Sequence, residues 1–177
     1  MSVMSFSFSD SPRKKSRIAH FKWITIAGIP LAAILYQVYF PSFFSRLAYL
    51  EMPLLVTVYF ALMRRSPVLG VLFGAGIGLA QDSLSDNPLG MFGIVKTLVG
   101  YLVASASLLV DADRSRMRLA LAFVFYVFHQ WAYWFVGATL LGQPLTFSIL
   151  ETLGLGVLNA LVAVPLYHIL DKLKIPE

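Results

Sequence analysis

The sequence predicts an all-α, polytopic membrane protein, a bundle of six transmembrane helices with both termini in the cytoplasm. Of its 177 residues, 58% are hydrophobic and only 13% are charged. The mean hydropathy of +0.75 is well above the value for a soluble domain. The apolar residues also gather into six runs, each near the length of about 20 residues that a helix needs to cross a bilayer. These runs occupy most of the chain, so we expect one compact bundle without a separate soluble domain.

The six expected spans are defined by apolar sequence and by the polar or turn-forming residues between them. They cover approximately residues 22–40, 47–63, 67–83, 88–110, 118–141 and 145–170. The second is the least regular, because Glu51 and Pro53 lie near its start. Proline is well tolerated in a first helical turn, so we expect Pro53 to begin the strong part of this span.

The connections on the predicted outer side are short. "QDSLSDNPLG" joins the third and fourth spans through an outer turn that contains Pro88 and Gly90, and "LGQPLT" joins the fifth and sixth. Serine, aspartate, asparagine, proline and glycine are the usual turn-forming residues. Short connections make consecutive helices antiparallel neighbours.

The positions of the basic residues predict the orientation. On a six-span arrangement, 12 of the 14 lysines and arginines fall on one side. They are Arg13, Lys14, Lys15, Arg17, Lys22, Arg64, Arg65, Arg114, Arg116, Arg118, Lys172 and Lys174. Arg46 lies on the other side and Lys96 lies within the membrane. Because basic loops stay in the cytoplasm, both termini are predicted to be cytoplasmic, and the net charge of +5 reflects topology and anionic lipid rather than nucleic acid.

The ends of the chain are predicted to be short cytoplasmic tails. Residues 1–17 are polar and rich in serine, and their basic cluster comes last, whereas a cleaved signal peptide would have its charges first. We therefore expect a disordered tail at 1–17, the six-helix domain at 18–172 and a C-terminal tail at 173–177. The sequence has no cysteine, which excludes disulfides and thiolate metal sites.

A stripe of glycines runs along the third span. Gly70, Gly74 and Gly78 recur at steps of four, and Asp82 continues the same step. Residues four apart lie on one face of a helix. Small residues at this spacing let two helices approach closely in lipid, so we expect this face to pack on a neighbouring helix.

The fourth span has a matching face that carries a charge. Gly93, Lys96 and Gly100 recur at steps of three or four. If Pro88 starts this helix, a lysine stem that snorkels outward can bridge most of the distance from Lys96 to Asp82. We therefore expect an ion pair between Asp82 and Lys96 at a glycine-lined interface of the third and fourth spans.

Two further polar residues complete the candidate intramembrane cluster. Glu151 in the sixth span is an alternative or additional partner for Lys96, and His129 in the fifth is expected to have a hydrogen-bonded structural role. Ionisable residues inside a membrane often mark functional sites. The alternative is that Lys96 and its acid only fix the packing of the bundle.

The sequence does not predict an enzyme. It has no H-E-x-x-H, no G-x-S-x-G and no glycine-rich phosphate loop. We expect no catalytic residue, cofactor or metal site. The aromatic stretch "FVFYVFHQWAYWF" in the fifth span either fills the bundle core or presents a lipid-facing or partner-facing groove. A groove for another protein's single transmembrane helix is a reasonable use.

From Pro53 to about Tyr101 the sequence resembles the bacterial rod shape-determining protein MreD family. The resemblance rests on "PLLVTVYFALMRR", "GVLFGAGIGLAQDSL" and "NPLGMFGIVKTLVGYL", in which the order G-x-x-x-Q-D then P-L-G is distinctive. Lys96 departs from the family, where an apolar or small residue is expected.

This resemblance implies a non-enzymatic scaffold in the bacterial cytoplasmic membrane. Its partners would be the bitopic protein MreC and the elongation complex of MreB filaments, the glycosyltransferase RodA and its transpeptidase. Such a scaffold couples the cytoskeleton to peptidoglycan synthesis.

The resemblance also supplies a second hypothesis. The family's fold is similar to the substrate-binding subunits of energy-coupling-factor vitamin transporters. A vitamin-binding subunit would need an outer pocket lined by polar groups such as Asp82, Lys96 and Glu151. The short outer loops leave little chain for a lid, which favours the scaffold.

Overall fold

A computed structural model describes residues 21–43, 48–85, 88–110 and 114–175. Within these ranges the chain forms six α-helices and no β-strand, so the predicted all-α class is confirmed. The helices are α1 (Trp23–Tyr39), α2 (Met52–Arg64), α3 (Pro67–Leu84), α4 (Met91–Ala106), α5 (Ser115–Phe135) and α6 (Ile149–Asp171). The predicted tail at 1–17, Arg46 and the last two residues of the predicted C-terminal tail lie outside the described residues.

The lengths and surfaces of the helices are those of a membrane protein. Three helical segments, Pro67–Leu84, Ser115–Leu140 and Ile149–Asp171, are long and apolar enough to cross a bilayer, and the other three helices are shorter and apolar. Large apolar side chains cover the outside of the bundle; Leu72 and Leu161, for example, are 60% and 58% exposed. Lipid, rather than water, suits such a surface.

Two helix starts show how proline acts in this chain. α2 begins at Met52 with Pro53 in its first turn, as the sequence predicts. The expected start of the fourth helix at Pro88 is wrong, because residues 88–90 form a turn and α4 begins at Met91. Gly90 in this turn has a φ of 94°, a backbone conformation that costs glycine little.

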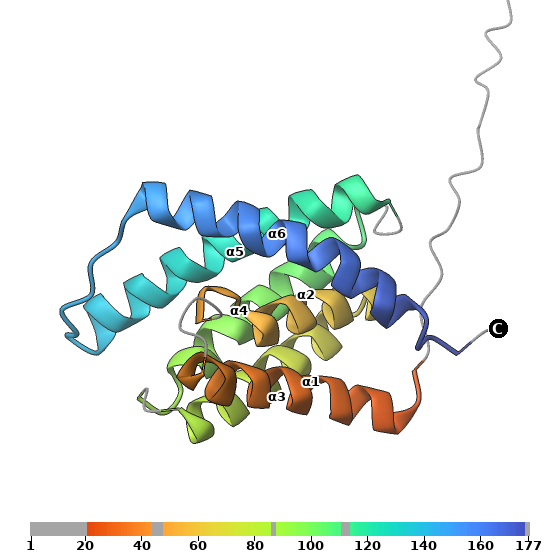
Figure 1. Cartoon of the computed structure of the whole chain (residues 1–177), viewed down its shortest axis with the longest axis horizontal. Coiled ribbons are helices and arrows are strands. Elements are labelled where there is room, and N and C mark those ends of the chain that lie inside the picture. The colour runs from red at the N-terminus through yellow and green to blue at the C-terminus, as the bar shows by residue number, and fades with distance from the viewer. Residues whose placement is uncertain (1–20, 44–47, 86–87, 111–113, 176–177) are drawn as a thin grey trace, which may run out of the picture.

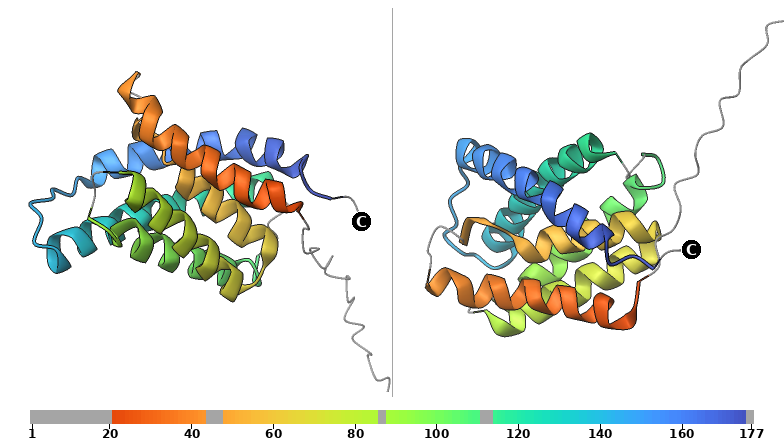
Figure 2. Two further views of the ribbon diagram at one scale, coloured as in Figure 1. Left: turned by 90° about the horizontal axis from the view of Figure 1, so that it is seen from below. Right: turned by 45° about the vertical axis from the view of Figure 1, so that its right-hand side comes forward.

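The helices form three layers (Figure 1). α5 and α6 lie side by side in one outer layer, α2 and α4 lie in the middle, and α1 and α3 lie on the opposite side, an arrangement that can also be followed in the right-hand view of Figure 2. α2 is the centre of the core, since every residue from Pro53 to Met63 is buried. It packs mainly against α1, α3 and α4.

The closest contact between two helices is that of α3 with α4, and glycines make it possible. Gly70, Gly74 and Gly78 lie against the backbone of α4, where a Cβ atom added at any of them would come within 3.0 Å of a carbonyl oxygen. Gly100 faces Gly70 in the same way, and Gly93 lies against side chains of α3. The backbones of the two helices therefore touch directly, which side chains larger than hydrogen would prevent.

Polar contacts tie together the end of the bundle where α6 finishes. Asp171 is bonded to the guanidinium of buried Arg118 and, at 2.9 Å, to the hydroxyl of Tyr59, which donates. Its carboxylate also lies 2.7 Å from Lys174. An antiparallel bridge between Phe21 and Lys174 brings the described start and end of the chain together here. The same end carries Arg64, Arg65, Arg114, Arg116 and Lys172.

The glycine contact predicts a position-dependent effect of alanine. Gly74→Ala should lower the free energy of unfolding by about 1–3 kcal/mol, because the new methyl group overlaps the Lys96 carbonyl and forces α3 and α4 apart. The measurement is thermal unfolding of the purified protein in detergent. Gly76→Ala on the same helix is the control, since its Cβ would meet nothing within 4 Å. Equal melting temperatures for the two variants would contradict the direct backbone contact.

Candidate functional site

Asp82 is a buried carboxylate that caps a helix other than its own. It lies in the last turn of α3 and is 1% exposed. Its Oδ2 accepts hydrogen bonds from the backbone N–H of Gly90 at 3.0 Å and of Gly93 at 2.9 Å, and its Oδ1 accepts one from Phe92 at 3.0 Å. These amides at the start of α4 have no partner within their own helix. Asp82 therefore fixes the α3–α4 turn and places negative charge at the positive end of the α4 dipole.

Lys96 is a fully buried lysine in the middle of the bundle. Its Nζ lies 3.8 Å from Oε2 of Glu51 and 3.4 Å from Nε2 of His129, and 4.1 Å from the centre of the Phe92 ring. The side chains of Lys96 and His129 are both 0% exposed, and that of Glu51 is 14% exposed. The ammonium thus has a counter-ion, a hydrogen-bond acceptor and an aromatic face around it, which offsets the cost of removing it from water.

Glu51 is the functional candidate that sequence reasoning missed. It directly precedes α2, and its backbone N–H donates to Oδ1 of buried Asn159 in α6 at 2.9 Å. The side-chain amide of Asn159 in turn donates to the carbonyl of Tyr49 at 2.8 Å and to that of Leu155 at 3.0 Å. A single asparagine thereby holds the entry to α2 so that the carboxylate of Glu51 faces Lys96. The signal in the sequence was an acid next to Pro53 and an asparagine within an apolar span.

The structure pairs Lys96 with Glu51 rather than with Asp82 or Glu151. The backbone amides of α4 occupy both oxygens of Asp82, and the backbone of Lys96 lies against Gly74 of α3 while its side chain reaches α5 and α2. Glu151 is exposed and lies in the first turn of α6. The predicted polar cluster is therefore split into a cap, a buried ion pair with His129, and a separate outer carboxylate.

His129 lies against Lys96 and an aromatic ring. Beside a Lys96 ammonium, which has only donors, Nε2 would accept the hydrogen bond and the ring proton would lie on Nδ1. Nδ1 is buried without a hydrogen-bond partner among the described residues. The ring stacks on Phe92 with an interplanar angle of 5° and centroids 6.1 Å apart. This imidazole accepts a bond from Lys96 and packs as an aromatic ring, which is a structural use.

The buried acids and the histidine offer little to a metal ion. Within the described parts of the chain, no three histidine, aspartate or glutamate side chains come close enough to hold one. Glu51 and His129 are separated by the ammonium of Lys96, and Asp82 is saturated by amides. Asp82 and Lys96 are also too buried to touch a ligand in this conformation.

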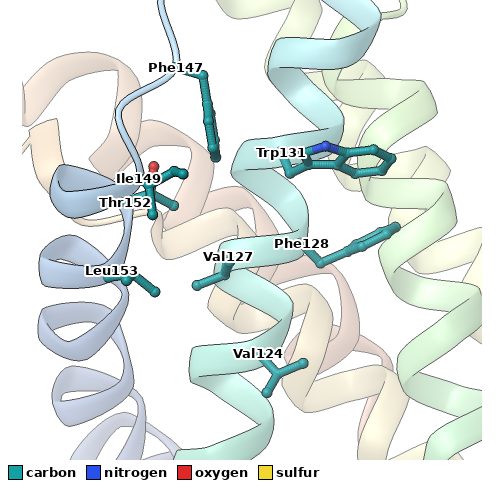
Figure 3. Close-up of a pocket in the computed structure, with 8 residues that line it drawn as sticks. All are labelled: Val124, Val127, Phe128, Trp131, Phe147, Ile149, Thr152 and Leu153. Atoms are coloured by element: carbon teal, nitrogen blue, oxygen red, sulfur yellow. The ribbon is translucent and has the colours of Figure 1, made fainter.

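The aromatic stretch of α5 is divided between the core and a groove on the outside of the bundle. Phe125 and Tyr126 are buried in the core. Trp131 is 46% exposed and, with Phe128, lines an apolar groove of about 400 Å³ beside α6 (Figure 3). A second hollow of about 210 Å³ adjoins it and is lined by Glu151 among others.

The cap predicts a local effect of removing Asp82. Asp82→Ala leaves three amides at the start of α4 without their acceptor, and each unsatisfied buried group costs about 1–3 kcal/mol. Hydrogen exchange should become faster at Gly90, Phe92 and Gly93. Ser83→Ala is the control, because the Ser83 hydroxyl is exposed and bonds only within its own helix, to the carbonyl of Leu79. Unchanged protection in Asp82→Ala would contradict the cap.

The ion pair predicts which second substitution rescues the loss of Lys96. Lys96→Met alone should lower the free energy of unfolding by roughly 3 kcal/mol, because Glu51 loses its counter-ion. Adding Glu51→Gln should recover most of this loss, whereas adding Asp82→Asn should deepen it. The measurement is chemical unfolding of the three variants and the parent in detergent. Rescue by Asp82→Asn and not by Glu51→Gln would reverse the assignment.

Comparison with known proteins supplies the family. A family model described as rod shape-determining protein MreD matches residues 17–174. No curated protein and no solved structure matches the chain significantly. The family match extends the resemblance seen between Pro53 and Tyr101 to α1, α5 and α6, and it confirms the family that the sequence motifs indicate. Because the match covers nearly all of the chain, the protein belongs to the rod shape-determining MreD family.

Proposed function

We propose that this protein is a non-enzymatic membrane scaffold of the bacterial cell-elongation complex. The family match over residues 17–174 carries the proposal, because the members of this family are rod shape-determining proteins and the family is not a known enzyme family. The chemistry of the interior agrees with a scaffold. Its buried ionisable groups, such as Asp82 and Lys96, are used by backbone amides and by other side chains of the same chain.

The proposed topology has six spans, with both termini in the cytoplasm of the bacterial inner membrane. It is supported by the even number of helices among the described residues and by the basic residues at the end of the bundle where α6 finishes. Basic segments stay on the cytoplasmic side. The turn capped by Asp82 and the segment between α5 and α6 would then face the outside.

The proposed partners are a bitopic protein of the MreC type and, through it, the MreB filaments and the RodA–transpeptidase pair. A scaffold of this kind needs a rigid body inside the membrane, so that a movement or force on one side of the membrane is transmitted to the other side. The backbone contact of α3 with α4 and the complete burial of α2 provide that rigidity. The apolar outer faces of the helices are surfaces on which a transmembrane partner can pack.

Depletion of the protein in its own rod-shaped host tests the proposal. We expect cells to widen and round up as the protein disappears, because wall synthesis is no longer confined to the pattern that makes a rod. Cell width measured by microscopy is the readout. Expression of the wild-type chain or of Gly76→Ala should restore the width, since neither disturbs the packing of α3 on α4.

The opposite outcome points to the vitamin-transport hypothesis. Depleted cells that keep their width but grow only when a vitamin is supplied would overturn the scaffold. Asp82, Lys96 and Glu151 would then have to line a common pocket in another conformation, since the first two are 1% and 0% exposed here.

A further inference from the structure

The groove between α5 and α6 is lined almost wholly by apolar side chains and would face lipid in the proposed arrangement. Val127 of α5 and Leu153 of α6 point towards one another across it, and Phe147 closes its end from the segment that joins the helices (Figure 3). Its volume of about 400 Å³ lies in the range of small-ligand sites. A transmembrane helix is about 10 Å wide and would rest on the rim of such a groove. A single hydrocarbon chain can enter it.

The hollow next to the groove has a different chemistry. Its lining includes the carboxylate of Glu151, the amide of Gln130 and the hydroxyls of Thr146 and Ser148. Glu151 is the one formal charge in this lining. The carboxylate attracts a positively charged group, and the hydroxyls can donate hydrogen bonds to the oxygen of a phosphate joined to that group.

The two hollows are neighbours. Phe147 and Thr152 line both of them, so the polar hollow adjoins the apolar groove at its Phe147 end. The segment that connects α5 and α6 is held against α5 by the indole N–H of Trp134, which donates to the carbonyl of Leu145 at 3.0 Å. The site thus has a polar part and an apolar part, which match the head group and the hydrocarbon chain of an amphiphile.

We propose that this site binds one phospholipid with a zwitterionic head group, its ammonium paired with Glu151 and one acyl chain lying between Val127 and Leu153. The membrane supplies such lipids in excess, so a weak site is filled. The ammonium forms a charge-assisted hydrogen bond to the carboxylate, and the hydroxyls of Thr146 and Ser148 serve the phosphate. The α5–α6 connection carries the hydroxyls for the phosphate, whereas α5 and α6 carry the carboxylate and the apolar side chains. The bound lipid would thus form part of the outer surface of the bundle between α5 and α6.

Lipid retention by the full-length protein tests this site. The protein is reconstituted in vesicles with equal amounts of phosphatidylethanolamine and phosphatidylglycerol, extracted in mild detergent and examined by native mass spectrometry. We expect one phosphatidylethanolamine to stay bound to the wild type. Glu151→Gln should reduce the preference for this lipid over phosphatidylglycerol by about two- to fivefold, the effect of a partly exposed ion pair.

A matched pair of tryptophan variants tests the apolar arm. Leu153→Trp fills the groove and should reduce the retained lipid on the order of tenfold, while Leu161→Trp should retain it. Both leucines are exposed on α6, at 41% and 58%, but Leu161 does not line the groove. Equal retention by the two variants, or equal amounts of the two lipids on the wild type, would overturn the proposal. So would a photo-crosslinker at position 153 that captures a transmembrane protein segment in host membranes instead of lipid.

Discussion

The direct backbone contact between α3 and α4 is the constraint on which the rest of the bundle depends. Gly70, Gly74 and Gly78 bring the two helices so close that they can be regarded as one unit. This contact sets the position of the first amides of α4 over Asp82 and turns the side chain of Lys96 towards α5 and α2. Without a hydrophobic force between helices in lipid, such close packing is the main source of association. The polar contacts then specify the register that the glycines permit.

The buried charges are stabilised by two kinds of partner, backbone amides and other side chains. Asp82 is satisfied by the backbone, as an anion at the start of a helix. Lys96 is satisfied by side chains from two other elements, Glu51 before α2 and His129 in α5. It therefore connects the α3–α4 unit to the central helix and to the outer layer. Removing one partner of a buried pair of this kind is costly, because the other charge is left unpaired.

The apolar runs were sufficient to predict the all-α class and the approximate place of each helix, and Pro53 correctly predicted the strong start of α2. The partner of Lys96 could not be predicted in the same way. Depth and helix face identify charges that can meet within the spans, but they do not show that backbone amides already occupy Asp82. They also overlook Glu51, which lies in a connection that Asn159 of α6 holds in place. The central position of α2 could not be predicted from the sequence either, because a helix that faces lipid and a helix that faces other helices have the same apolar composition.

In the proposed six-span arrangement, helices of different length would meet the bilayer. α2 has 13 residues, which span about 20 Å at 1.5 Å per residue against about 30 Å of hydrocarbon, but other helices enclose it, so its short length does not meet lipid. In the proposed six-span arrangement α1 and α4 are also short, with 17 and 16 residues, while α6 has 23. The bilayer beside α1 and α4 would have to thin, and that beside α6 would not, because each ångström of hydrophobic mismatch costs a fraction of a kilocalorie per mole. A protein with this asymmetry would gather neighbours whose own spans are short, so membrane thickness would help to select the proteins that assemble around it.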